Sequence, residues 1–262
     1  MHHRLLLLAL SCVSCGGSDD EGRATRVLEG HKLYDLVEKT YPEYDGYAFD
    51  HMLIDRKEDP NKVLDLMDLR PGDAVGDIGC GSGFYTLLFA EKVGPTGQVW
   101  AIDVQTLAVE RLLERLKEPA LLKFTNIRVF RTPVNETFIP PATLDAALLS
   151  HADFYAFTEQ LEENRQMLGA LYRSLKATGR MAVVQNMKIV PDSTNEIILQ
   201  NFKDARFQVD RVYTDPDSAV SYFLFQKPLN GPPAPPPVAP RWIEESSSPP
   251  IPPPRSVSAE PQ

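Results

Sequence analysis

Short apolar stretches alternate with longer segments of helical periodicity in this chain, and this alternation limits its fold more than any other feature. The apolar stretches are rich in Val, Ala, Ile and Leu, and each has the length of a strand. They lie at residues 74–78, 98–102, 126–130, 144–149 and 180–184, and the helical segments lie at 84–93, 106–117 and 159–175. Such alternation is typical of a parallel sheet with helices on both faces. The sequence therefore predicts an α/β fold.

The last two apolar stretches are joined differently. Residues 206–212 and 221–226 are separated only by a turn at 214–217. A connection this short cannot hold the crossover helix that parallel neighbours need, so the pair must be antiparallel. The expected sheet thus has five parallel strands followed by an antiparallel hairpin.

A glycine-rich loop lies where the first strand meets the first helix. Residues 77–83 read DIGCGSG, and Asp103 ends the second strand twenty residues after Gly83. Glycines allow a tight turn and the close approach of a ligand, while the following helix offers free N–H groups. A carboxylate at the end of the second strand can hold two ribose hydroxyls. The alternative is a tight strand-to-helix connection that binds no ligand.

The spacing argues against two common nucleotide sites. Residue 84 is Phe, so the dinucleotide pattern G-x-G-x-x-G lacks its last glycine, and no G-x-x-x-x-G-K-[ST] sequence occurs. Asp77 stands before the first glycine, where a carboxylate would repel a pyrophosphate but suits a cationic amino-acid headgroup.

With these residues the chain resembles the class I S-adenosylmethionine-dependent methyltransferases. The resemblance extends over about residues 59–227 and includes residues 77–83, 99–103, 140–145 and 175–180. It implies a Rossmann-like three-layer sandwich, with a seven-stranded, mostly parallel sheet whose last strand is antiparallel. It also implies S-adenosyl-L-methionine as the cofactor.

The resemblance implies roles for the candidate cofactor-binding residues. Asp77 would contact the methionine end, and Asp103 the ribose. Asn135 takes the place of an acid that reaches adenine in many relatives. The remaining candidates back the cofactor and are Gly79, Cys80, Gly81, Gly83 and Ser150.

Candidate catalytic residues follow the fourth strand, at the same edge of the sheet. His151 or Asp153 could act as a general base, and Tyr155 could shape the acceptor pocket. The alternative is that His151 caps the strand and the aromatic side chains pack under the next helix. No spacing of these residues indicates a metal site.

The two ends of the chain are expected to lie outside this domain. Residues 1–15 resemble a bacterial lipoprotein signal peptide, with Cys15 as the acylated residue. Residues 16–58 would form a linker and an N-terminal lid, residues 59–228 the methyltransferase domain, and residues 229–262 a Pro-rich disordered tail. The protein would then be exported and anchored in the cell envelope. Plain secretion, or a cytoplasmic protein with a wrongly assigned start codon, are the alternatives.

The overall charge limits the substrates. A formal net charge of -9 opposes binding to nucleic acid. The sequence therefore predicts a methyltransferase for an unidentified small molecule or protein side chain, and leaves the oligomeric state undetermined. The alternatives are a non-catalytic exported lipoprotein that uses the fold as a binding or scaffold module, and a nicotinamide oxidoreductase.

Overall fold

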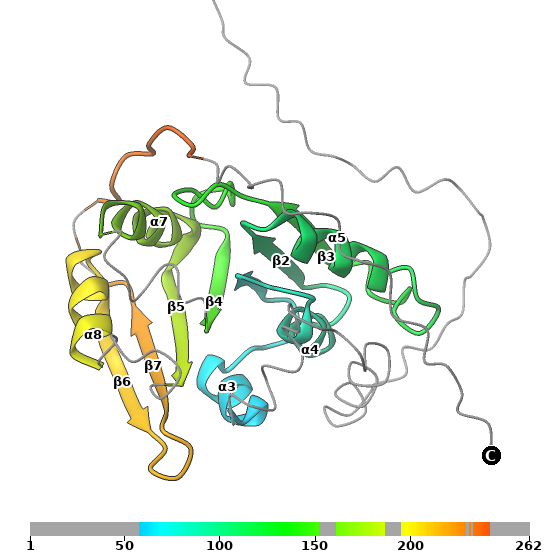
Figure 1. The fold of residues 1–262 in the computed structure, drawn as a ribbon, viewed down its shortest axis with the longest axis horizontal. Helices are drawn as coiled ribbons and strands as arrows, with labels where there is room; N and C mark the ends of the chain where they lie inside the picture. The colour runs from blue at the N-terminus through cyan, green and yellow to red at the C-terminus, as the bar shows by residue number, and fades with distance from the viewer. Residues whose placement is uncertain (1–57, 152–160, 187–194, 229–230, 232, 242–262) are drawn as a thin grey trace, which may run out of the picture.

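Seven strands form a single sheet in the order β3-β2-β1-β4-β5-β7-β6 (Figure 1). The structure is a computed structural model that describes residues 58–151, 161–186, 195–228, 231 and 233–241. The strands are β1 (Ala74–Ile78), β2 (Gln98–Asp103), β3 (Ile127–Arg131), β4 (Leu144–Ser150), β5 (Leu175–Asn186), β6 (Gln208–Thr214) and β7 (Val220–Gln226). Strands β1 to β5 pair in parallel, whereas β7 is antiparallel to both β5 and β6. The predicted fold class and the antiparallel hairpin are confirmed.

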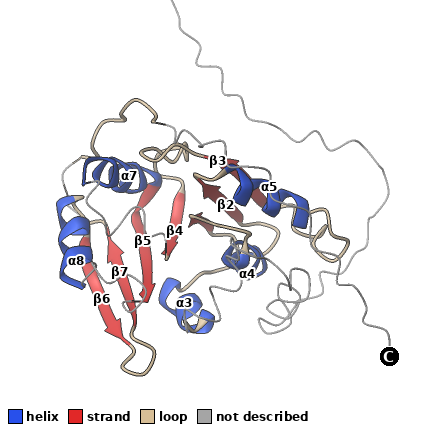
Figure 2. Ribbon diagram, viewed as in Figure 1, coloured by secondary structure: helices blue, strands red, loops and turns tan. Residues whose placement is uncertain are grey.

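Helices cover the two faces of this sheet (Figure 2). They are α3 (Pro60–Met67), α4 (Phe84–Val93), α5 (Thr106–Arg115), α7 (Leu161–Ser174) and α8 (Asn195–Asp204). Alternate residues of a strand point to opposite faces. Val75 of β1 thus packs with α3 and α4, while Ile78 of the same strand packs with α7 and α8. Both faces are buried, as a mostly parallel sheet requires.

The helices α3 and α8 and the first residue of β5 were not predicted from the sequence. The helix α3 begins with Pro60, and the Asp59 side chain accepts a hydrogen bond from the Asn61 backbone N–H. The strand predicted at residues 180–184 is longer in the structure, since β5 begins at Leu175, and its register against β4 shifts between Leu144 and Ala146. The strand absorbs the extra residues as an irregularity instead of ending there.

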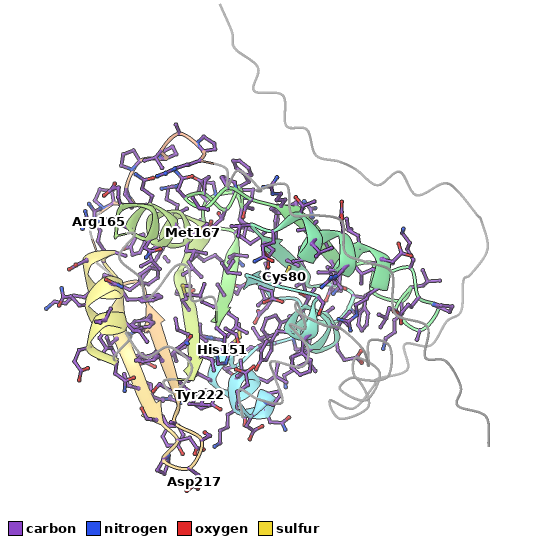
Figure 3. All side chains as sticks on the ribbon, in the orientation of Figure 1. Cys80, His151, Arg165, Met167, Asp217 and Tyr222 are labelled. Atoms are coloured by element: carbon purple, nitrogen blue, oxygen red, sulfur yellow. The ribbon has the colours of Figure 1, made fainter. Side chains whose placement is uncertain are left out.

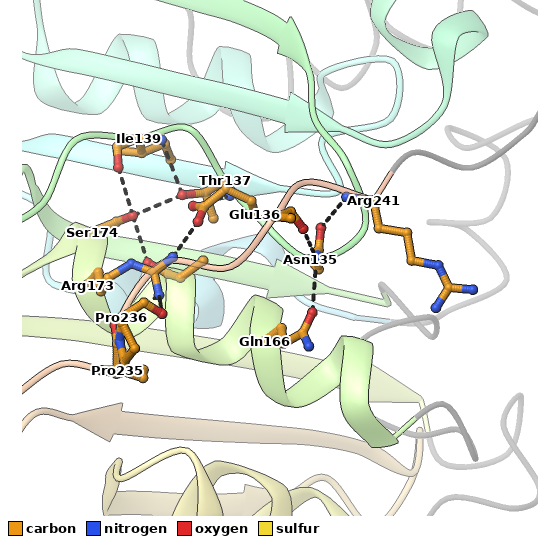
Figure 4. A network of polar contacts seen from close by, with 12 residues as sticks. Asn135, Glu136, Thr137, Ile139, Gln166, Arg173, Ser174, Pro235, Pro236 and Arg241 are labelled. Atoms are coloured by element: carbon orange, nitrogen blue, oxygen red, sulfur yellow. Dashed lines mark hydrogen bonds and ion pairs between the residues drawn. The ribbon is translucent and has the colours of Figure 1, made fainter. Parts of the chain in front are cut away.

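The C-terminal residues 233–241, called the strap below, run back over α7 toward the loop after β3 (Figure 4). Arg173 Nη1 donates to the carbonyls of Pro235 and Pro236 at 3.2 and 3.3 Å. An added Cβ on Gly169 of α7 would lie 2.9 Å from Pro235 Cγ, so the helix and the strap are in close contact.

The strap ends on the loop after β3. Asn135 Nδ2 donates to the Ala239 carbonyl at 2.8 Å, and its Oδ1 accepts from the Arg241 N–H at 2.7 Å. The Val134 N–H donates to the Arg241 carbonyl at 2.9 Å. The Pro-rich composition predicts a disordered tail over residues 229–262, but Pro235, Pro236, Ala239 and Arg241 form hydrogen bonds with the domain. Proline carbonyls still accept hydrogen bonds although prolines lack N–H groups, and composition alone did not reveal these partners.

Within the described residues, no helix has the length and apolar character needed to cross a bilayer. The same part of the chain contains no group of three or more His, Cys, Asp or Glu side chains arranged to hold a metal ion.

Candidate active site

The loop between β1 and α4 is shaped by three glycines with positive φ. Gly79, Gly81 and Gly83 have φ values of 74, 55 and 94°, a region that side chains with a Cβ rarely adopt. The N–H groups of Gly79 and Cys80 both donate to the Ile102 carbonyl, at 2.8 and 3.0 Å. The loop is therefore tied to the end of β2, beside Asp103.

Asp77 lies buried in β1, one residue before the strand ends. The Thr86 Oγ1 hydroxyl donates to Asp77 Oδ2 at 2.5 Å. Burial raises the pKa of Asp77 to about 7, the Thr86 hydrogen bond opposes this rise, and the nearby Asp103 charge adds to it. Near neutral pH this carboxyl group is therefore poised between its neutral and charged forms.

Asp103 ends β2 and is also buried. Its Oδ2 accepts from the Gly81 N–H at 3.0 Å, and its Oδ1 accepts from the Gln105 N–H at 2.9 Å. Burial raises the pKa of Asp103, while these backbone hydrogen bonds lower it. Each oxygen keeps a lone pair for a further donor, because a carboxylate accepts about four hydrogen bonds.

A buried arginine contacts the glycine loop, and its role there was not predicted from the sequence. Arg115, the last residue of α5, is 1% exposed and its Nη1 donates to the Ser82 carbonyl at 2.5 Å. Leu112 of the same helix fills the space beside Gly83. Arg115 ends an amphipathic helix, where an arginine side chain is usually expected to face solvent. The sequence pattern therefore does not indicate that Arg115 contacts the loop.

Cys80 and Ser150 occupy different surroundings in the site. Cys80 is buried in the loop, and burial raises the pKa of its thiol well above the usual value. The thiol is therefore protonated at neutral pH and is a poor nucleophile. Ser150 ends β4, where its hydroxyl donates to Glu58 Oε2 at 3.3 Å.

His151 follows β4 directly, and its ring contacts Glu58, which the sequence places in the predicted linker and N-terminal lid. Its Nε2 lies 2.8 Å from Glu58 Oε2, with both side chains almost fully buried. Figure 3 labels His151 and also Cys80 in the loop after β1. Glu58 precedes the domain boundary drawn from the sequence and carries no recognisable motif. Asp153 and Tyr155, the other catalytic candidates, lie outside the described residues.

Asn135 is placed differently from the other cofactor-binding candidates. Its side chain is buried, and its Nδ2 donates to Gln166 Oε1 at 2.9 Å as well as to the strap (Figure 4). Both amide protons therefore have partners within the protein. The described arrangement gives this side chain a role in holding the strap, and its predicted contact with adenine stays a prediction.

The two carboxylates suit S-adenosylmethionine, the cofactor of the family that the sequence resembles. Within the described residues, neither Asp77 nor Asp103 forms an ion pair with a cationic side chain. Buried carboxylates without such a partner are costly, and a cationic ligand would offset that cost. An ammonium and a ribose diol both supply the donors that these acceptors need.

Comparison with known proteins agrees with this geometry. Residues 75–179 match the sequence profile of a family described as a methyltransferase domain. A protein-L-isoaspartate O-methyltransferase from Ignicoccus hospitalis is 30% identical over 121 residues, which are 46% of this chain and 51% of that protein. A demethylmenaquinone methyltransferase from Listeria welshimeri is 26% identical over 157 residues, 58% of this chain and 61% of that protein. The chain thus spans between half and two thirds of the length of these curated relatives.

A solved structure supports the same assignment. The crystal structure of a SAM-dependent methyltransferase from Aquifex aeolicus has a TM-score of 0.55 and 25% sequence identity, covering 76% of this chain and 98% of that chain. The fold and the site define a Rossmann-like domain with two buried carboxylates toward the carboxyl ends of β1 and β2. Residues 75–179 are thus similar to a methyltransferase domain, and the fold is similar to that of a SAM-dependent methyltransferase.

Proposed function

We propose that this protein transfers a methyl group from S-adenosylmethionine to a small molecule or to an exposed protein side chain. The observation that carries the proposal is the pair of buried carboxylates, Asp77 and Asp103, at the ends of adjacent parallel strands. When bound, S-adenosylmethionine supplies a methyl group on a sulfonium whose departure leaves a neutral thioether. Asp77 would hold the ammonium of the donor and Asp103 its ribose, with the glycine loop against them.

The same carboxylates argue against a purely structural scaffold. A module that had lost its ligand would gain stability by replacing two buried acids that lack cationic partners in the described part of the chain. Both acids are present, and the Gly81 N–H of the loop donates to Asp103. This favours a donor-binding enzyme over the non-catalytic alternative.

The acceptor side of the site is proposed to use His151 as the general base. It directly follows β4, the strand that pairs with β1 on the side away from β2. The carboxyl ends of parallel strands meet at one edge of a sheet, so His151 lies at the same edge as the glycine loop. Asp153 and Tyr155 follow in sequence and are proposed to line the acceptor pocket.

Calorimetric titration of the full chain tests the donor assignment. We expect micromolar binding of S-adenosylmethionine and S-adenosylhomocysteine, and weaker binding in Asp77→Asn and Asp103→Asn. Asp65→Asn, on the exposed side of α3, is the matched control and should bind as the wild type does. Absence of binding to folded wild-type protein would refute the proposed function.

We further propose that residues 1–15 form a lipoprotein-like signal segment that is cleaved before Cys15, and that the retained Cys15 is acylated, which would anchor the enzyme in the cell envelope. This rests on the cationic start, the short apolar run and the Cys followed by Gly and Ser. Mass spectrometry of membrane-extracted protein checks it. A mature N-terminus at a lipidated Cys15 is expected, and an intact Met1 would exclude it.

A further inference from the structure

The strap is held on the domain by hydrogen bonds and buries little of its own surface. Only Pro235 and Val238 of the strap are half-buried, and its other residues are exposed. Arg173 donates to two of its carbonyls, and Arg206 donates to the carbonyl of Pro233. Segments with few buried apolar contacts are the first to open locally. The strap can therefore detach while the sheet stays folded.

Helix α7 has a glycine at the point where the strap crosses it. A glycine in the interior of a helix is unfavourable, because it has more backbone freedom to lose than other residues. Gly169 is buried, and an added Cβ would lie 2.9 Å from Pro235 Cγ. Arg173 lies one turn further along, where its Nη1 binds the strap and its Nη2 pairs with Glu136 of the loop after β3 (Figure 4). The helix therefore fixes the docked position of the strap at two points.

The end of the strap occupies polar groups of the loop after β3. Asn135 donates to the Ala239 carbonyl and accepts from the Arg241 N–H, and its other amide proton goes to Gln166. The Val134 N–H donates to the Arg241 carbonyl. The edge of an adenine also presents donors and acceptors side by side. A base at this loop would therefore compete with the strap for the same groups.

This loop lies where the base of the proposed donor would extend. Asp77 and Asp103 lie toward the carboxyl ends of β1 and β2, and β3 is the next strand outward. The Thr132 N–H donates to the Asp103 carbonyl at 2.9 Å, so the loop begins beside the proposed ribose site. Neighbouring strands are only about 4.8 Å apart, which is less than the length of a nucleoside. With the amino acid at Asp77 and the ribose at Asp103, the base is directed toward Val134 and Asn135.

We propose that the strap is an autoinhibitory segment, which takes the place of the donor's adenine base at the loop after β3 and must leave this loop before S-adenosylmethionine can bind there. This inference rests on the proposed function. Because the strap and the base exclude each other, the apparent affinity for the donor falls with the fraction of molecules whose strap is docked. By the same linkage, a bound donor shifts the strap toward its detached position.

A disulfide between residues 169 and 235 tests this inference in the full chain. An added Cβ on Gly169 would lie 3.9 Å from Pro235 Cβ, within the range of about 3.5–4.5 Å found in disulfides. The double variant Gly169→Cys/Pro235→Cys, with its bond verified by peptide mass spectrometry, should bind S-adenosylhomocysteine at least about tenfold more weakly when oxidised than when reduced. Wild-type protein treated with the same oxidant is the control for the thiol of Cys80. Equal affinities of the oxidised and reduced forms would overturn the inference.

A second variant displaces the strap instead of fixing it. Leucine is a good helix former, and the side chain introduced by Gly169→Leu would fill the place of the Pro235 ring. We expect this variant to bind S-adenosylhomocysteine about three- to tenfold more tightly than the wild type. Arg165→Leu, at an exposed position of α7, is the matched control and should leave the affinity unchanged. Unchanged or weaker binding in folded Gly169→Leu would refute the inhibitory role.

A ligand without the base locates the effect. S-Ribosylhomocysteine carries the amino acid and the ribose, so its affinity should be the same in the oxidised and reduced forms of the double variant. An equal loss of affinity for both ligands on oxidation would reject competition with the base. Absence of S-adenosylhomocysteine binding to the folded wild type would reject the proposed function itself. Normal binding that is insensitive to the disulfide would reject only the role of the strap.

Discussion

The Thr86 hydroxyl donates a 2.5 Å hydrogen bond to Asp77, a carboxyl group whose pKa is raised to about 7. Only the ionised form attracts a cationic headgroup, so donor binding should strengthen as Asp77 loses its proton. We expect S-adenosylmethionine to bind several-fold more tightly at pH 7.5 than at pH 6.0. Calorimetric titration across this range measures the change. Asp77→Asn is the control for titration of the ligand itself, and an equally steep profile in that variant would exclude Asp77 as the cause.

The same raised pKa affects stability. A carboxyl group whose pKa rises on folding, here from 3.8 to about 7, contributes stability below the unfolded value. That contribution is lost as the pH rises through 7. Asp77→Asn does not titrate, and its amide oxygen can still accept from Thr86. Its melting temperature relative to the wild type should therefore be higher at pH 8 than at pH 5, by an amount equivalent to about 1–3 kcal/mol. A difference independent of pH would contradict this.

Asp103 combines ligand binding with support of the loop. Asp103→Ala removes both acceptors of the Gly81 and Gln105 N–H groups, which should cost about 1–3 kcal/mol of unfolding free energy. Asp103→Asn keeps one acceptor oxygen and should be less destabilising. Both should weaken S-adenosylhomocysteine binding by about tenfold or more, as measured by calorimetry on folded protein. Unchanged affinity in both variants would remove Asp103 from the ribose site.

Gly83 of the glycine loop lies against Leu112, and this contact leads to a prediction for its substitution by alanine. Gly83 has a φ of 94°, and an added Cβ would lie 2.3 Å from Leu112 Cδ1. Gly83→Ala should therefore destabilise the protein by about 2–4 kcal/mol in denaturant unfolding, because strain and overpacking add. Gly72 also has a φ of 94°, but an added Cβ there would come no closer than 3.8 Å to its nearest neighbour, Thr96 Oγ1. Gly72→Ala should cost about 1–2 kcal/mol, and equal costs at the two positions would contradict the clash.

The sheet and the glycine loop were largely predictable from the sequence, whereas the buried partners of His151 and of the loop were not. Local patterns specify the strand β1, the helix α4 and the glycine loop, because each depends on neighbouring residues in the chain. Glu58 and Arg115 act through partners 93 and 33 residues away in sequence, so no local pattern marks them. The strap could not be predicted for a related reason. Its hydrogen bonds depend on Asn135 and Arg173, which lie far from it in the chain.

Removing the strap should weaken the fold. A chain ending at residue 228 loses the strap carbonyls that accept hydrogen bonds from Val134 N–H, Asn135 and Arg173, and we expect its melting temperature to fall by about 4–8 °C. A chain ending at residue 241 keeps these contacts and is the matched control. If both truncated chains melt together with the full chain, the strap contributes nothing to stability.

The position of β7 in the sheet has a consequence for how the chain matures. Strand β6 has β7 as its sheet partner, and β7 also covers the outer edge of β5. A nascent chain that ends before Val220 would therefore leave β5 with an open edge and β6 without a neighbour. Such edges promote aggregation. The seven-stranded sheet is therefore complete only once the chain up to Gln226 has left the ribosome.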